Sequence, residues 1–231
     1  MLKSSVSGGN GHSIMSKVWR PMKSSVPFYT GDLLLPSKTH PYLYTILNSS
    51  FTIYSVSEGK ILSQIEEDII QFALLSPQEN EEEDQVILAT SKNTLLHYRI
   101  SDKVCLRTIK GGHQMPVTCM AINSTASLLA TGSTDKSIRV FDILKGHCTH
   151  LFKHHTGILT CLSFHPNPYN LTLISTAEDN STRIYDLNSS ESIGVCDQHL
   201  RTPKSLALDS SGYILATCAN DKVIIFIINL L

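Results

Sequence analysis

Residues 131–142 read TGSTDKSIRVFD, and residues 175–186 read STAEDNSTRIYD. The same pattern recurs as ATSKNTLLHYRI at 89–100, as TCANDKVIIFII at 217–228 and, more weakly, as YTILNSSFTIYS at 44–55. When the copies are aligned on the apolar residue near the end of each segment, their spacings are 44, 43, 44 and 42 (Tyr54, Tyr98, Phe141, Tyr185, Ile227). A second column lies six residues earlier and keeps these spacings (Asn48, Lys92, Asp135, Asp179, Asp221). Two columns in one register over five copies establish an internal repeat.

Each copy divides into short β-branched and aromatic runs separated by polar turns. In the third copy the predicted strands are VTCMAI (117–122), LLATGS (128–133), SIRVFD (137–142) and CTHLFK (148–153). No long stretch has the 3.6-residue period of a helix. We therefore predict an all-β chain of about five four-stranded antiparallel blades, the last one incomplete. The repeats are expected near 26–65, 66–111, 112–153, 154–197 and 198–231.

A repeat of about 40–45 residues with four strands and a terminal Trp-Asp-like dipeptide resembles the WD40 repeat. The dipeptide is present here as Phe141-Asp142 and Tyr185-Asp186. The resemblance implies a β-propeller, which five blades can form in two ways. A spare segment near 25–29 could pair beside 222–229 and close a five-bladed ring, or the blades could form an open arc of a larger propeller. We expect the open arc, with apolar surface exposed on its end blades, because propellers of this kind suit about seven repeats.

Composition and charge exclude several function classes. The formal net charge is −1, so no global field attracts nucleic acid or an anionic membrane. No apolar run is long enough to span a membrane. Residues 1–25 are rich in Ser, Gly and Lys and carry no acid, which predicts a flexible basic leader; the alternative is an arm that contacts RNA or an acidic protein. The run Glu79-Asn80-Glu81-Glu82-Glu83-Asp84 predicts a solvated loop; the alternative is a docking segment for a basic partner.

Six cysteines occur without a zinc-binding spacing, and we interpret them as reduced, buried apolar groups (Cys105, Cys119, Cys148, Cys161, Cys196, Cys218). His147, His150 and His154 straddle a predicted strand whose faces alternate, so we expect no metal site. Motifs for phosphate loops, nucleophile elbows and RNA readout are absent, so we expect no cofactor and no small-molecule substrate.

His, Ser/Thr and Asp recur together in three copies: His113, Thr131 and Asp135; His155, Ser175 and Asp179; His199, Thr217 and Asp221. These residue types invite comparison with a hydrolase triad. A nucleophile needs one activated site in a cleft, however, and an array of equivalent sites is not typical of an enzyme. The residues instead resemble the WD40 hydrogen-bonded chain from His through the hydroxyl and Asp to Trp. Because Trp is missing from all three copies, we predict a structural network of His, hydroxyl and Asp alone, and no enzyme activity.

Four segments resemble the transducin-beta-like WD-repeat subunits of the small-subunit processome. They are Val26-Pro27-Phe28-Tyr29-Thr30-Gly31 before the first blade, the stretch 127–142, the turn Phe164-His165-Pro166-Asn167-Pro168, and Asn220-Asp221-Lys222-Val223-Ile224-Ile225. The resemblance covers about residues 17–231. It implies a nucleolar scaffold for pre-rRNA processing and small-subunit assembly. The implied partners are other processome subunits and WD-repeat proteins, with indirect association with small nucleolar RNA and pre-rRNA. The alternative is a general WD40 adaptor in ubiquitin ligation or signalling.

Overall fold

The computed structural model describes residues 33–37, 39–75 and 84–228. Within these residues the chain forms nineteen strands and no helix, so this part contains no helix that could cross a membrane. The strands build five antiparallel sheets, and within each sheet the strands lie in chain order. The predicted leader at 1–25, the segment 26–31 and the acidic residues 79–83 lie outside the described residues.

The first four sheets are four-stranded blades. Blade 1 contains β1 (Leu34–Pro36), β2 (Tyr42–Leu47), β3 (Ser50–Ser55) and β4 (Lys60–Ile65). Blade 2 contains β5 (Ile69–Leu75), β6 (Gln85–Thr90), β7 (Thr94–Arg99) and β8 (Val104–Lys110). Blade 3 contains β9 (Val117–Ile122), β10 (Leu128–Ser133), β11 (Ile138–Asp142) and β12 (His147–Phe152). Blade 4 contains β13 (Leu159–Phe164), β14 (Thr172–Ala177), β15 (Thr182–Asp186) and β16 (Glu191–Cys196).

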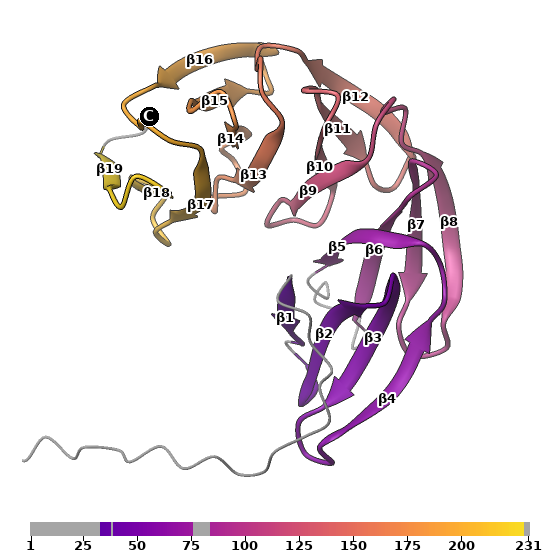
Figure 1. Cartoon of the computed structure of the whole chain (residues 1–231). Helices are drawn as coiled ribbons and strands as arrows, with labels where there is room; N and C mark the ends of the chain where they lie inside the picture. Colours follow the sequence, from indigo (N-terminus) through magenta and orange to yellow (C-terminus); the bar gives the residue numbers. More distant parts are fainter. Residues whose placement is uncertain (1–32, 38, 76–83, 229–231) are drawn as a thin grey trace, which may run out of the picture.

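Blade 5 has three described strands, β17 (Pro203–Leu208), β18 (Ile214–Ala219) and β19 (Ile224–Ile228). The five blades follow one another along an open arc, and the two ends of the arc do not meet (Figure 1). This confirms the predicted all-β architecture and the open arc. The described residues of blade 5 end at a free strand edge, β19.

The register repeats from blade to blade. The third and fourth strands of each complete blade pair with a bulge just before the aligned aromatic residue, at Tyr54, Tyr98, Phe141 and Tyr185. A bulge bends the strand and increases its twist. Because the bend occurs at the same repeat position in each complete blade, these blades have similar shapes and can pack against their neighbours in the same way.

The hydrophobic core lies between neighbouring blades. One cluster joins blades 1 and 2 through Phe51 and Phe72, whose rings meet edge to face with centroids 5.2 Å apart. Another joins blades 3 and 4 through Phe152 and Tyr185, with ring centroids 4.4 Å apart. Among the described residues of blade 5, only Leu215 is a buried member of a hydrophobic cluster. Each blade therefore depends on its neighbours, and the last blade is the least covered.

Candidate functional site

A buried histidine connects a loop, a strand and a turn in blade 3. His113 lies in the loop before β9, and its Nδ1 is 3.0 Å from Asp135 Oδ2 in the β10–β11 turn. Its Nε2 is 2.8 Å from the hydroxyl of Thr131 on β10. His113 is 5% exposed and Thr131 is fully buried. The imidazole therefore links a loop, a strand and a turn that are separate in the sequence.

The arrangement recurs in the next two blades. In blade 4, His155 Nδ1 lies 2.8 Å from Asp179 Oδ2 and its Nε2 lies 2.7 Å from Ser175 Oγ. In blade 5, His199 makes the corresponding contacts at 3.1 Å and 2.9 Å (Asp221 and Thr217). The three groups lie on one face of the arc, which we call the triad face. It consists of the interblade loops 111–116, 153–158 and 197–202 and the turns 134–137, 178–181 and 220–223.

The aspartates bind backbone as well as imidazole. Asp135 Oδ2 accepts the backbone N–H of Gln114 at 3.1 Å, and its Oδ1 accepts the backbone N–H and the hydroxyl of Ser137 at 2.9 Å and 2.5 Å. Asp179 binds Thr156 and Ser181 in the same way. Besides the imidazole of His199, Asp221 accepts the backbone N–H groups of Leu200 and Val223. Each carboxylate therefore fastens an interblade loop to the neighbouring turn.

The order of the links differs from the sequence-based prediction. Histidine is the central member, with Asp on Nδ1 and the hydroxyl on Nε2; the predicted path through the hydroxyl to Asp is wrong. Ser137 and Ser181 belong to the network and were not predicted. Their signal in the sequence is a Ser two residues after Asp, in Asp135-Lys136-Ser137 and in Asp179-Asn180-Ser181. Ser at this position binds the carboxylate in the manner of an Asx turn.

The position expected to hold Trp carries other residues in all three blades. Phe141 and Ile227 offer no donor, and Tyr185 is fully buried. The Tyr185 hydroxyl makes no well-formed hydrogen bond with the described atoms, and burial raises its pKa to about 12 against a lowering effect of the nearby Ser175 hydroxyl. The network therefore ends at the hydroxyl residue in these blades.

In blades 3 and 4 the network holds a neutral histidine beside an ionised aspartate. Burial lowers the pKa of His113 and of His155, against the opposing effect of their Asp partners. Burial alone would raise the pKa of Asp135, but hydrogen bonds from Ser137, His113 and Gln114 lower it to about 2. An ionised carboxylate only accepts hydrogen bonds, so Nδ1 of His113 donates to it and Nε2 accepts the Thr131 hydroxyl.

This geometry leaves no room for a substrate at the three hydroxyl groups. Thr131 and Ser175 are fully buried, and Thr217 is 1% exposed. A nucleophile has to reach its substrate. What the network can do is tie loops and turns into a fixed surface on the triad face.

Residues 103–142 and 146–186 match the family described as WD domain, G-beta repeat. The chain carries WD40 repeats. Transducin beta-like protein 3 of Mus musculus is 32% identical over 204 residues, which are 86% of this chain and 25% of that protein. The protein of the same name in Bos taurus is 31% identical over 202 residues, 85% of this chain and 24% of that protein.

A third relative is periodic tryptophan protein 2 of Arabidopsis thaliana. It is 29% identical over 119 residues, which are 50% of this chain and 13% of that protein. The chain thus spans about a quarter of the length of transducin beta-like protein 3, the relative it matches over most of its own residues.

The turn after β13 in blade 4 packs against blade 5. His165, in the turn 164–168, is 8% exposed and accepts the backbone N–H of Asn167. Gly212 has a φ of +78° and lies so close that a Cβ there would be 1.9 Å from His165 Nε2. A side chain at position 212 would therefore clash with the ring and also strain the backbone.

The acidic run is not solvated along its whole length. Asp84, its last member, is 8% exposed, and it accepts the hydroxyls of Tyr44, at 2.7 Å, and Ser37. The prediction of a solvated loop is therefore wrong for Asp84, which bonds across the boundary between blades 1 and 2. The sequence gives no signal of this contact, because its partners lie 40 and 47 residues away.

Asp84→Ala is expected to lower the free energy of unfolding by about 2 kcal/mol, because the buried Tyr44 hydroxyl loses its acceptor. Chemical denaturation of the purified chain measures this. The matched control replaces Glu81, Glu82 and Glu83 by Ser and is expected to leave the midpoint unchanged. An Asp84→Ala protein as stable as the parent would show that the contact contributes nothing.

The cysteines differ from their expected surroundings. All six are free, but only Cys119 is buried; Cys105 and Cys148 are exposed and the other three are half-buried, so the prediction that all six are buried is wrong. The two exposed cysteines lie on fourth strands, β8 and β12, whose residues are mostly exposed. His150 Nε2 lies 2.9 Å from the carbonyl of Leu187 in blade 4. The described residues contain no group of three His, Cys, Asp or Glu side chains that could hold a metal ion.

Stability is expected to fall as the pH drops from about 7.5 to about 5. Because the pKa values of His113 and His155 are lowered by burial, the unfolded chain binds protons below about pH 6.5 that the folded chain does not. The contribution of Asp135 is present above its unfolded pKa of 3.8 and is lost as the pH falls towards 2. Thermal unfolding at several pH values measures both effects. A midpoint that is constant between about pH 7.5 and about pH 5 would contradict this assignment of neutral histidines.

Proposed function

We propose that the chain is a non-enzymatic scaffold of the nucleolar small-subunit processome, which supports pre-rRNA processing and small ribosomal subunit assembly. The observation that carries the proposal is the similarity to transducin beta-like protein 3 over 86% of the chain. The four segments that resemble processome WD-repeat subunits favour the same role. WD40 blades by themselves do not define a function, so the segment-specific resemblance is what distinguishes this role from a general adaptor.

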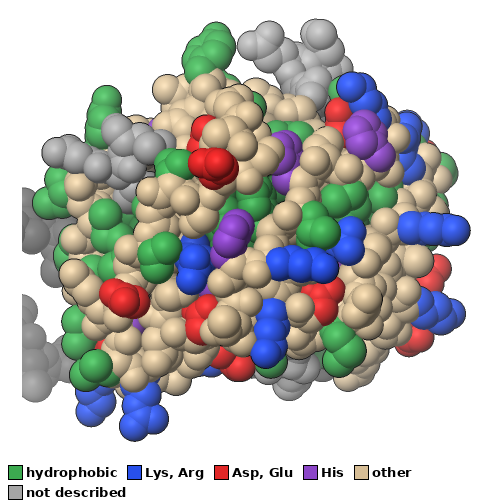
Figure 2. Space-filling model, turned by 90° about the horizontal axis from the view of Figure 1, so that it is seen from above, with side chains coloured by type: hydrophobic (Ala, Val, Ile, Leu, Met, Phe, Trp, Pro, Cys, Tyr) green, Lys and Arg blue, Asp and Glu red, His purple; other side chains and the backbone are tan. Residues whose placement is uncertain are grey.

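The structure supports a role in protein binding. The fastened loops of the triad face form a surface that needs little ordering when a partner binds, which lowers the cost of association. Seen from the side of β12 and β16, basic, acidic and apolar side chains are intermixed (Figure 2). A mixed surface of this kind suits protein partners better than a single basic stripe would, since nucleic acid binding requires clustered positive charge. Contact with small nucleolar RNA and pre-rRNA is therefore proposed to be indirect.

The test is purification of the tagged native protein, followed by mass spectrometry of its partners and by microscopy. The proposal expects nucleolar accumulation and co-purification of processome subunits. Treatment with ribonuclease is expected to remove the RNA and to leave part of the protein set bound. A diffuse cytoplasmic pool with ubiquitin-ligase or signalling partners would favour the adaptor role and contradict the proposal.

A further inference from the structure

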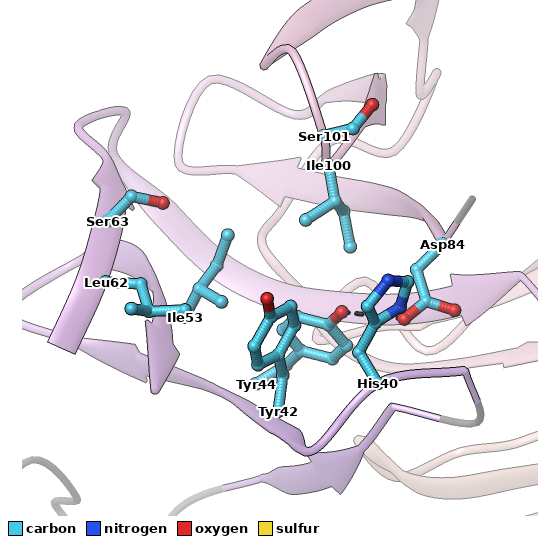
Figure 3. Close-up of a pocket in the computed structure, with 9 residues that line it drawn as sticks. All are labelled: His40, Tyr42, Tyr44, Ile53, Leu62, Ser63, Asp84, Ile100 and Ser101. Atoms are coloured by element: carbon cyan, nitrogen blue, oxygen red, sulfur yellow. Dashed lines mark hydrogen bonds between the residues drawn. The ribbon is translucent and has the colours of Figure 1, made fainter. Parts of the chain in front are cut away.

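A pocket of about 440 Å³ opens between blades 1 and 2 (Figure 3). Blade 1 contributes His40, Tyr42 and Tyr44 from the end of the blade where β2 begins, and Leu62 from β4. Blade 2 contributes Asp84, immediately before β6, and Ile100, immediately after β7. In antiparallel blades these strand ends lie on the face opposite to the triad face. The pocket is therefore separate from the His–Asp network, and its volume is in the range of ligand sites.

Asp84 brings a carboxylate to this pocket. The group is 8% exposed and binds two neutral hydroxyls, those of Tyr44 and Ser37. It forms no ion pair with another described residue. Burial raises the pKa of Tyr44, and so does its hydrogen bond to Asp84, so the phenol stays protonated and donates to the carboxylate. Burying a carboxylate is costly unless it is paired, and a cation entering the pocket would offset that cost.

The rest of the lining suits the stem of a long basic side chain. The rings of His40 and Tyr42 stack with centroids 5.2 Å apart and an interplanar angle of 11°. In Figure 3 the two tyrosine rings lie between Leu62 and Ile53 on one side and His40 and Asp84 on the other, with Ile100 facing them. Aromatic faces attract cations, and the apolar side chains can cover the methylene groups of lysine or arginine.

We propose that this pocket binds a lysine or arginine side chain presented by a partner protein. The proposal rests on the proposed scaffold function only in that it requires a protein partner. Asp84 binds the charged end, the aromatic rings contact the cation and its stem, and Leu62 and Ile100 exclude water from the stem. Basic anchor residues inserted into pockets of this kind carry much of the binding energy at protein interfaces.

The test is a titration of the isotope-labelled full chain, followed by nuclear magnetic resonance. The probes are the capped pentapeptides acetyl-Gly-Ser-Arg-Ser-Gly-amide and its Lys and Gln counterparts. The Arg or Lys peptide is expected to shift the backbone signals of blades 1 and 2 around the pocket, and the Gln peptide is not. Asp84→Asn keeps an oxygen acceptor for the Tyr44 and Ser37 hydroxyls and is expected to weaken binding about tenfold or more.

Two further variants make the result specific. Leu62→Arg places a cation at the wall of the pocket and is expected to abolish binding, whereas Glu191→Gln on blade 4 removes a distant acid and is expected to have no effect. Equal binding of the Gln peptide, or undiminished binding to a folded Asp84→Asn protein, would overturn the proposal. Binding of putrescine but of neither basic peptide would assign the pocket to a free polyamine. Binding of the peptides only after Lys38→Gln would assign it to the chain's own lysine. Both outcomes would also overturn the proposal.

These outcomes are independent of the processome assignment. If the chain binds basic peptides through Asp84 but is absent from the nucleolus, the pocket proposal is supported and the proposed function is contradicted. If the chain is nucleolar but its pocket binds no basic peptide, the proposed function is supported and the pocket proposal is contradicted.

Discussion

Replacing Asp135 by Ala is expected to lower the free energy of unfolding of the chain by about 3 kcal/mol. The carboxylate accepts bonds from His113, from the Gln114 backbone, and from the backbone and hydroxyl of Ser137. Its removal takes the acceptor from the Nδ1–H group of the buried imidazole, from the Ser137 hydroxyl and from two backbone N–H groups, and it frees the loop before β9 from the turn after β10. Urea unfolding followed by circular dichroism measures the change.

The matched control is Asp102→Ala, since Asp102 forms an exposed ion pair with Arg99 at 2.9 Å. Surface pairs of this kind contribute less than about 1 kcal/mol, so the control is expected to unfold close to the parent. Asp179→Ala should resemble Asp135→Ala, because its contacts are the same. An Asp135→Ala protein that unfolds with the control would contradict the structural role of the network.

Gly157→Ala is expected to destabilise the chain by about 3 kcal/mol or more. A Cβ at position 157 would lie 2.3 Å from the backbone nitrogen of Asp179. The atom in the way belongs to the backbone and cannot move aside by rotating. The loop before β13 would have to withdraw from the turn that holds Asp179, and the bond between Asp179 and the Thr156 backbone would lengthen with it. Urea unfolding again gives the free energy.

Gly194→Ala is the matched control for this substitution. Its Cβ would meet the end of the flexible Ile184 side chain at 3.2 Å, so a small rotation relieves the contact. We expect a change of less than about 1 kcal/mol. If the two variants lose the same free energy of unfolding, the close approach at Gly157 is not what makes substitution there costly.

The periodic features of this chain could be predicted from the sequence, and the contacts between blades could not. The strands β9 and β10 coincide with the predicted 117–122 and 128–133, because β-branched runs and turn residues mark them locally. The His and Asp columns were visible because they recur with the repeat. The sequence did not reveal that histidine, rather than the hydroxyl residue, is the central member of each group. Spacing alone does not say which ring nitrogen contacts which side chain.

The burial of Asp84 could not be predicted from its neighbours in the sequence. Its neighbours in the sequence are acids, and composition assigns all of them to water. Its burial is decided by Tyr44 and Ser37, which belong to a different blade. The exposed Cys105 and Cys148 show the converse, because strand-forming neighbours in the sequence do not reveal that a strand is the outermost one of its blade.

The five blades form an open arc, and in the part of the chain that the structure describes its last strand, β19, has one unpaired edge. Within the described residues β19 pairs only with β18, and its Ile224, Phe226 and Ile228 side chains are 60%, 62% and 67% exposed. The equivalent strand of blade 4, β15, pairs on both sides, with β14 and β16. Hydrogen exchange of the backbone amides compares these two strands within one sample. The open arc predicts much faster exchange in β19 than in β15, whereas equal protection of the two strands would show that another strand covers β19 and would contradict the open arc.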